Sequence, residues 1–334
     1  MASKARQLAQ SASAPESRKN ILFNGAMQIA QRSTSATSVS TAGYHACDRW
    51  DLTMGGRDNA VFTVSQNTSN IVDGFSNSFK VQTTTVESDI ASTEYFIVRQ
   101  IIEAQHLQHL AYATSSAKTT TLSFYVKSSV AATFAVYLYK PDSTARVIGG
   151  TYTINSADTW EYKTITFAGD TDSGATINDD NGHGFHLAFV LGVGSAYTPT
   201  DNTSWADYST GNLAFGHAGN AVITTTNATW EITGVQFEVG SVATEFEHRS
   251  ETEELALCKR YYHALSTERT LYASDYGSHS FARLAAPTTM RAVPTVTATA
   301  SSTVLGSYHT HDMVQLYLTG NAANANTAKL DAEL

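Results

Sequence analysis

Charged side chains are scarce in this 334-residue chain: Asp, Glu, Lys and Arg make up 15% of it, against roughly 25% in an ordinary soluble domain. The few charges that are present sum to −9 at pH 7. Binding to a phosphate backbone requires a cationic surface, so we expect no nucleic-acid partner. Ser, Thr, Asn and Gly replace the missing charges, which is typical of a β-rich exterior that faces sugars or other subunits.

Long apolar runs and cysteines are also rare. No window approaches the roughly 18 consecutive apolar residues of a membrane span, and the N-terminus has no apolar signal-peptide core, so we expect no membrane insertion. The two cysteines, Cys47 and Cys258, lie far apart in the sequence, and the second falls on an apolar stripe. Buried free thiols are therefore expected rather than a disulfide.

Catalytic signatures are absent from the sequence. It contains no G-x-S-x-G elbow, H-E-x-x-H motif, P-loop or Cys–His signature, and we expect no enzyme. It also has no repeat period, which disfavours the long β-helix of polysaccharide-degrading proteins, and no heptad run that would encode a fibre shaft.

Alternating apolar and polar residues dominate the first two thirds of the chain. Leu122, Phe124 and Val126 fall on one face of a predicted strand, and residues 134–138 and 185–191 repeat the pattern. Gly, Asn and Asp turns separate these runs. The following ranges are further strand candidates: 60–66, 78–82, 95–102, 160–168 and 230–239. Their length and spacing predict an antiparallel sandwich, with one short helix at 103–110.

A helix is predicted after the last of these strands. Ser250 followed by Glu253 has the form of a capping box, which satisfies backbone N–H groups at a helix start. The apolar stripe expected to form a domain or oligomer interface consists of Leu255, Cys258, Tyr261, Tyr262 and Leu265. The remaining chain, with strand candidates at 270–273, 295–299 and 314–318, is a unit of about 70 residues whose core alone would be only marginally stable.

The sequence thus predicts four parts: a basic arm at 1–19, a β-sandwich at 20–248, a linking helix at 249–266 and a small β domain at 267–334. The arm is defined by Lys4, Arg6, Arg18 and Lys19. Two interpretations of it stay open: a disordered tail, or a segment that docks onto a negatively charged partner.

Aromatic residues gather in the predicted loop at 194–219, which contains Tyr197, Trp205 and Tyr208. Exposed rings bind sugars because the C–H face of a pyranose stacks on them while Asn, Asp and Thr bond its hydroxyls. The alternative is that such rings fill the end of the sandwich, the Trp in particular. The sequence therefore indicates a candidate glycan site here without excluding a core role.

Two clusters could bind metal. Residues 169–182 gather Asp170, Asp172, Asp179 and Asp180, whose oxygens suit calcium, although the EF-hand spacing is absent and turns use Asp for backbone reasons alone. His309 and His311 would point to the same side of a strand and could bind a transition metal, or be two solvated histidines. No other cofactor is expected.

Several motifs resemble one module family. These motifs are, in chain order, NGAMQIAQR, DRW, LSFYVKS and TWEYKTITFAGDT, and then VQFEVGSVATEFEHRS followed by ELALCKRYY. Together they resemble a jelly-roll module that is similar to carbohydrate-binding modules. This module recurs in tail fibres and other virion proteins of tailed phages, especially marine ones. The resemblance covers most of residues 20–262. It implies a jelly-roll sandwich, followed by the linking helix and the small C-terminal β domain.

The resemblance also implies a role. We expect a virion structural protein made in the host cytoplasm and, by analogy with phage fibres, a trimer in which three His309–His311 pairs would surround one axis. The favoured function is a tail fibre or tail-appended adhesin that attaches to another tail protein by its arm and contacts host surface glycan. The alternatives are a capsid decoration or head-fibre protein without host recognition, and a polysaccharide-degrading tailspike.

Overall fold

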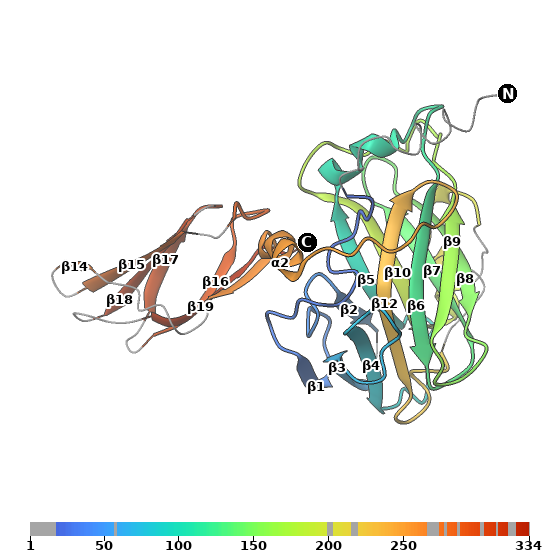
Figure 1. Cartoon of the computed structure of the whole chain (residues 1–334), viewed down its shortest axis with the longest axis horizontal. Coiled ribbons are helices and arrows are strands. Elements are labelled where there is room, and N and C mark those ends of the chain that lie inside the picture. The colour runs from blue at the N-terminus through green and yellow to red at the C-terminus, as the bar shows by residue number, and fades with distance from the viewer. Residues whose placement is uncertain are drawn as a thin grey trace.

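The computed structural model describes residues 18–56, 59–198, 203–214, 220–265, 274–276, 279–285, 288–300, 304–311, 313–319 and 325–333. It confirms the predicted fold: an antiparallel β-sandwich of jelly-roll type, a short helix and a small C-terminal β domain (Figure 1). In the part of the chain that is described, no helix is long and apolar enough to cross a membrane.

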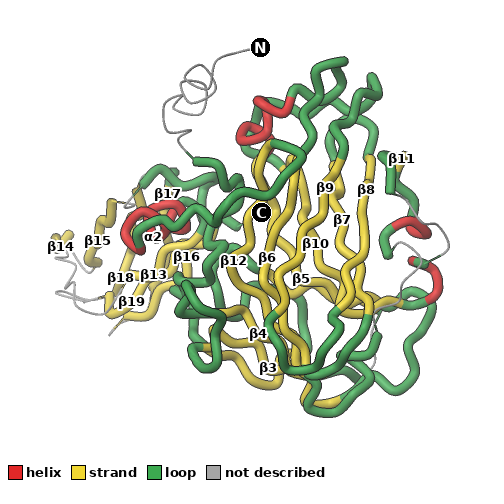
Figure 2. The backbone as a smooth tube through the Cα atoms, turned by 45° about the vertical axis from the view of Figure 1, so that its right-hand side comes forward, coloured by secondary structure: helices red, strands yellow, loops and turns green. Residues whose placement is uncertain are grey.

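Two six-stranded sheets form the sandwich (Figure 2). The first contains, in spatial order, β1 (Ser35–Val39), β3 (Val61–Asn67), β4 (Ser78–Thr85), β12 (Thr229–Val239), β6 (Thr120–Ser128) and β9 (Glu161–Phe167). The second contains β11 (Ala206–Asp207), β8 (Arg146–Thr153), β7 (Thr133–Lys140), β10 (His183–Val193), β5 (Tyr95–Glu103) and β2 (Asp51–Gly55).

The alternation in the sequence determines which side chains face the space between these sheets. Phe189 of β10 lies at the centre, with its ring centroid 5.0 Å from Phe124 and 5.7 Å from Trp230. The ring of Trp50 also packs against Phe189, with centroids 6.3 Å apart. All four rings are fully buried. Trp50 and Trp230 are therefore core residues, whereas Trp160 is only partly buried.

Three short 3-10 helices join strands of the sandwich: η1 (Ala104–Leu110), η2 (Ser195–Tyr197) and η3 (Thr210–Asn212). The first coincides with the helix predicted at 103–110. The C-terminal domain has two small antiparallel sheets. One contains β13 (Tyr262–Leu265), β19 (Ala325–Asp331) and β16 (Thr295–Ala300), and the other β14 (Ser274–Tyr276), β15 (His279–Ala285), β18 (Met313–Thr319) and β17 (Val304–His309).

The predicted linking helix is shorter than expected. Helix α2 spans Glu251–Lys259, and Ser250 caps it by accepting a hydrogen bond from the Glu253 amide at 3.3 Å. The prediction that the helix continues through Tyr261, Tyr262 and Leu265 is wrong. These residues leave the helix because the chain pairs as β13 with β19, which satisfies its backbone groups in a sheet.

The buried face of α2 also differs from the expected stripe. Glu254 and Cys258, one turn apart, are its buried residues, and Leu255 is only partly covered. The Glu254 carboxylate accepts a hydrogen bond from the Asn24 amide and lies 3.6 Å from the Arg249 guanidinium, which explains why an acid can be buried here. Both Cys47 and Cys258 are buried free thiols, as predicted.

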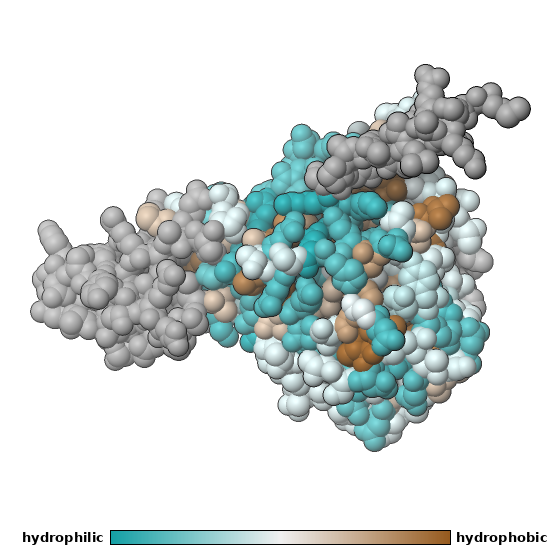
Figure 3. Space-filling view, in the orientation of Figure 1, coloured by the Kyte–Doolittle hydropathy of each residue, from teal (hydrophilic) through white to brown (hydrophobic). Residues whose placement is uncertain are grey.

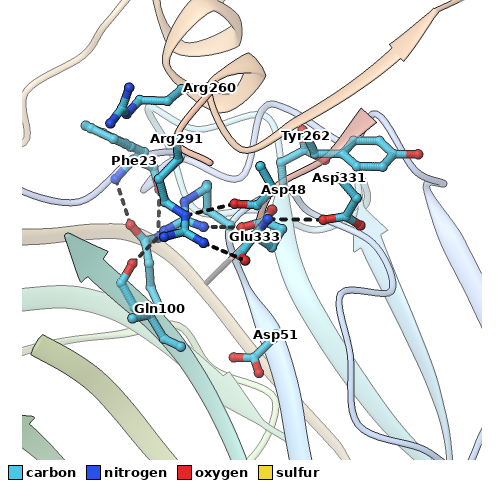
Figure 4. A network of polar contacts seen from close by, with 12 residues as sticks. Phe23, Asp48, Asp51, Gln100, Arg260, Tyr262, Arg291, Asp331 and Glu333 are labelled. Carbon is cyan, nitrogen blue, oxygen red and sulfur yellow. Dashed lines mark hydrogen bonds and ion pairs between the residues drawn. The ribbon is translucent and has the colours of Figure 1, made fainter. Parts of the chain in front are cut away.

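A polar network joins the sandwich to the C-terminal domain (Figure 4). Arg49 is 1% exposed and forms an ion pair with Glu333, while its guanidinium lies 3.4 Å from the centre of the Tyr261 ring. Arg32 contacts Glu333 at 3.3 Å and Asp331 at 3.0 Å. Because these contacts are buried or half-buried, removing one partner would leave an uncompensated charge at the junction of the two domains.

The motifs that carried the resemblance meet beneath this network. Asn24 donates to the carbonyls of Ile29 and Asp48, at 2.8 and 2.9 Å, and accepts from the Ile29 amide. The Asp48 carboxylate accepts from the Gln31 backbone amide at 2.9 Å and from its side chain. Burial raises the pKa of Asp48 to about 6, although the bonds from Gln31 oppose that rise. NGAMQIAQR and DRW are thus structural motifs of the domain junction.

Candidate functional site

A groove of about 250 Å³ lies on the outer face of the second sheet. Its lining residues come mainly from β5, β7 and β10, with Tyr197 of η2 and Tyr208 after β11 at its border. The described residues that line it are Thr53, Tyr95, Ile97, Arg99, Tyr137, Tyr139, His186, Tyr197, Tyr208 and Leu213. The loop predicted from its aromatic residues therefore supplies one edge of a larger site.

Strand register explains why the groove is hollow. Arg99 of β5 and Tyr137 of β7 both lie opposite Ala188 of β10, so a methyl group separates two long side chains. Residues two apart in a strand share a face, which places Tyr95 and Ile97 beside Arg99 while the residues between them point into the core. The small residue on the central strand leaves room between its larger neighbours.

Tyrosine rings border this hollow in two pairs. Tyr95 and Tyr197 form an edge-to-face contact with centroids 5.9 Å apart, and Tyr139 and Tyr208 lie 5.0 Å apart. The hydroxyl of Tyr197 donates to the Thr93 carbonyl at 3.1 Å, which fixes that ring. Tyr208 is 40% exposed. Its ring therefore keeps surface available for a ligand.

The polar side of the groove is an ordered chain of side chains. Arg99 donates through Nε to both carboxylate oxygens of Asp51, at 3.1 and 3.2 Å. Its Nη1 lies 3.4 Å from Nδ1 of His186, whose Nε2 lies 3.0 Å from Nδ1 of His183. An arginine can only donate, so Nδ1 of His186 accepts and its Nε2 carries the proton that bonds His183.

Burial is the main cause that holds the pKa of His186 well below its usual value, and the nearby charge of Arg99 lowers it further. His186 is thus neutral at physiological pH. Burial also raises the pKa of Tyr137, so this phenol stays protonated. The groove consequently offers neutral donors and acceptors beside one cation, Arg99.

Trp205 lies apart from Tyr197 and Tyr208. Its ring stacks on Phe185 with centroids 6.1 Å apart, meets Tyr112 edge to face at 5.7 Å, and its Nε1 donates to the Ala168 carbonyl at 2.7 Å. It fills the end of the sandwich, which was the alternative to a glycan contact.

The candidate calcium loop is occupied by cations of the protein itself. Arg146 forms a two-point ion pair with the buried Asp170, and the carboxylates of Asp172 and Asp180 accept from the Gly174 and Gly182 amides two residues on. Asp179 is exposed. Among the described residues, no three His, Cys, Asp or Glu side chains form a group that could hold a metal.

A buried lysine occupies the centre of the same region. Lys140 is fully buried, and the three N–H groups of its ammonium lie within hydrogen-bond distance of the backbone carbonyls of Asp142, Thr144, Gly174 and Thr176. Carbonyl oxygens in such a cage are the ligands that a hard cation would take. The ammonium of Lys140 therefore stands where a bound cation would otherwise be needed.

The remaining predicted residues are only partly described. Arg18 and Lys19 are exposed at the start of the described chain, while Lys4 and Arg6 lie outside it. His309 ends β17 and His311 is exposed in the following bend, but the side chain of His309 lies outside the described residues. The metal-binding pair stays a prediction.

Sequence reasoning missed several groove residues: Tyr95, Arg99, Tyr139 and His186. The available signal was the alternation within each strand, which placed Tyr95 and Arg99 on the face away from the core. Their convergence depends on β5, β10 and β7 being neighbours, which alternation does not reveal.

Comparisons with known proteins gave structural likenesses only. No protein-family model matches the chain, and no curated protein matches it. Among solved structures, the enzymatically active domain of tailspike protein 4 of bacteriophage CBA120 is 16% identical, with a TM-score of 0.38, covering 66% of this chain and 22% of that one. The family 11 carbohydrate-binding module of Clostridium thermocellum is 12% identical, with a TM-score of 0.30, covering 65% and 99%. A putative sugar-binding protein of Bacteroides thetaiotaomicron is 12% identical, with a TM-score of 0.34, covering 66% and 100%. At these values the likenesses assign no function.

Proposed function

We propose that this chain is a glycan-binding protein and that the groove on the second sheet is its binding site. The observation that carries the proposal is the arrangement of Tyr95, Tyr139, Tyr197 and Tyr208 around an open hollow with Arg99 and His186 within reach. Tyrosine rings stack on the C–H faces of sugars, and the polar groups bond hydroxyls.

The groove has the chemistry of binding rather than of hydrolysis. Glycoside hydrolysis ordinarily uses two carboxylates about 5 to 10 Å apart. Among the described residues that line the groove, none is an acid, and the nearby Asp51 carboxylate is held by Arg99. Arg99 further favours a ligand with acidic, oxygen-rich substituents, because its guanidinium is a cation that can only donate hydrogen bonds.

Titration calorimetry with acidic oligosaccharides identified on a glycan array tests the site. We expect Tyr208→Ala to weaken binding roughly fivefold or more, since loss of a stacking ring removes about 1 kcal/mol. Tyr208→Phe keeps the ring and is the matched control, which should bind within about twofold of wild type. Equal binding by wild type and Tyr208→Ala would refute the groove as the site.

We further propose that the protein is attached to a phage virion as a tail fibre or tail-appended adhesin. The support is the sequence resemblance to tailed-phage virion modules, together with the basic arm that contains Lys4 and Arg6. In this proposal the arm binds another tail protein, the chain forms a homotrimer, and the groove contacts host surface glycan.

Antibody labelling of intact virions tests this location. Label at the tail supports the adhesin, whereas label across the capsid favours the decoration or head-fibre alternative, and release of sugar from host polysaccharide would indicate a tailspike. Deleting residues 1–19 should leave a folded oligomer that no longer joins particles. Normal incorporation of the truncated protein would contradict the docking role of the arm.

A further inference from the structure

A second groove, of about 420 Å³, lies on the outer face of the first sheet, opposite the one described above. Strands β6, β9 and β12 form its floor, and two loops, 73–75 and 243–248, form its wall. Its aromatic lining residues are Phe75, Tyr125, Tyr162, Phe246 and His248. On the molecular face drawn in Figure 3, hydrophobic residues gather in separate small patches among polar ones.

The rings of this groove form one connected cluster. Tyr125 and Tyr162 lie directly opposite each other on neighbouring strands, with centroids 5.0 Å apart. Phe75 lies 5.7 Å from Tyr125 and 5.0 Å from Phe246. Tyr162 is 48% exposed although it packs against Tyr125. A positioned ring with a large exposed area is suited to stacking on a sugar.

The wall of the groove is held in place by the strand beneath it. Gly234 has φ +59 where the register of β12 shifts, and a Cβ there would lie 2.6 Å from Cζ of Phe75. This left-handed backbone favours glycine, and a Cβ at this position would push the Phe75 ring away. On the other side, the buried Glu238 carboxylate accepts from the Thr244 amide at 2.8 Å and its hydroxyl at 2.7 Å. The groove is therefore built by folded structure on both sides.

The charge of this groove differs from that of the first. Its described lining residues include the carboxylates of Asp73 and Glu245 and no lysine or arginine. Ionised carboxylates accept hydrogen bonds only, so they suit a ligand rich in hydroxyl donors and repel an anionic one. The hydroxyls of Ser123 and Thr244 add further polar contacts. Aromatic surface beside acceptors and without a cation matches a neutral sugar.

We propose that this groove is a second glycan-binding site, selective for neutral sugars and independent of the first groove. The two sites lie on opposite faces of one sandwich, so a single chain can bridge two glycan strands. Such bridging raises the apparent affinity for a dense glycan surface without strengthening either site.

The test uses the full chain on a microarray of neutral and acidic oligosaccharides, followed by titration with the neutral gluco-, galacto- or manno-oligosaccharides that it retains. Three variants are compared with wild type: Tyr162→Ala, Tyr162→Phe and Tyr208→Ala. We expect Tyr162→Ala to weaken binding of the neutral set roughly fivefold, and Tyr162→Phe to stay within about twofold because the stacking ring is kept. Tyr208→Ala should leave these neutral ligands bound.

Three results would overturn the proposal. The first is a neutral-glycan profile that Tyr162→Ala does not change. The second is loss of all glycan binding in Tyr208→Ala, which would leave the first groove as the site for every ligand. The third is a change in oligomeric mass by light scattering in Tyr162→Ala with unchanged glycan binding, which would make the groove an interface between copies of the chain. Loss of acidic ligands alone in Tyr208→Ala would support both grooves.

Discussion

The buried ion pair between Arg49 and Glu333 gives the strongest stability prediction. Arg49 is 1% exposed, its Nη2 donates to the Ile101 carbonyl at 2.5 Å, and its planar face stacks on Tyr261. Glu333→Gln keeps the shape of the side chain but removes its charge, which leaves a guanidinium buried between the two domains without its counter-ion. Breaking a buried pair in this way costs about 3 to 5 kcal/mol.

Part of that cost is offset in this protein. Arg32, the second partner of Glu333, keeps its 3.0 Å contact with Asp331, and the cation–π contact of Arg49 remains. We therefore expect Glu333→Gln to lower the unfolding free energy by about 3 kcal/mol, the lower end of that range. Denaturant unfolding followed by fluorescence measures this loss. Because the pair joins the two domains, limited proteolysis should also release the C-terminal domain earlier in the variant.

The control is an ion pair with an exposed partner. Asp207 lies 2.7 Å from Arg146, but its side chain is 73% exposed, so Asp207→Asn should cost less than about 1 kcal/mol. Arg49→Met combined with Glu333→Leu should recover most of the stability, because apolar replacement of a whole buried pair is often neutral. If Glu333→Gln costs no more than Asp207→Asn, the buried pair does not hold the domains together.

Two further predictions concern buried charge. The pKa of Asp48 is about 6 in the folded state, against the ordinary value of 3.8. Between these two pH values the folded protein therefore binds a proton at Asp48 that the unfolded protein has released. The stability that this group contributes is complete below about pH 4 and is lost as the pH rises through 6. The loss is roughly 3 kcal/mol. The unfolding free energy of Asp48→Asn should therefore fall less than that of wild type between pH 4 and pH 7. Asp89 is exposed, so Asp89→Asn is the control and should behave as wild type. Parallel pH profiles for Asp48→Asn and wild type would refute the raised pKa of Asp48. Lys140→Met removes the three N–H donors that the carbonyl cage shares and should cost at least about 3 kcal/mol. Calcium should raise the melting temperature of this variant relative to a chelator and leave that of wild type unchanged; a calcium response in wild type would show that Lys140 does not replace a cation.

The sequence predicted most of the sandwich because each strand has its own apolar face. The alternation at Leu122, Phe124 and Val126 requires only that this side be buried, and all three are fully buried in β6, although Ser123 and Lys127 on the other face are covered as well. The helix cap at Ser250 is likewise local. Strands β2 and β8 were not predicted, because their sequences do not alternate clearly between apolar and polar residues. Their residues are buried by neighbouring strands instead.

The end of the helix could not be predicted from periodicity. Spacings of three and four place Leu255, Cys258 and Tyr262 on one helical face, yet the chain leaves the helix at Lys259. Pairing of β13 with β19, more than sixty residues later in the sequence, decides that boundary. Such pairing is a non-local interaction, and local propensity is a weak guide when it competes.

The sequence by itself determined the fold class, the buried thiols and the low charge of the surface, since each depends on residue type or on neighbours within a few positions. Only the tertiary structure decided the sites. It separated Trp205 from Tyr197 and Tyr208, placed Lys140 in the carbonyl cage, and brought Arg99 and His186 together across β5 and β10. The reason is physical: alternation fixes the face on which a side chain lies, whereas strand order fixes its neighbours.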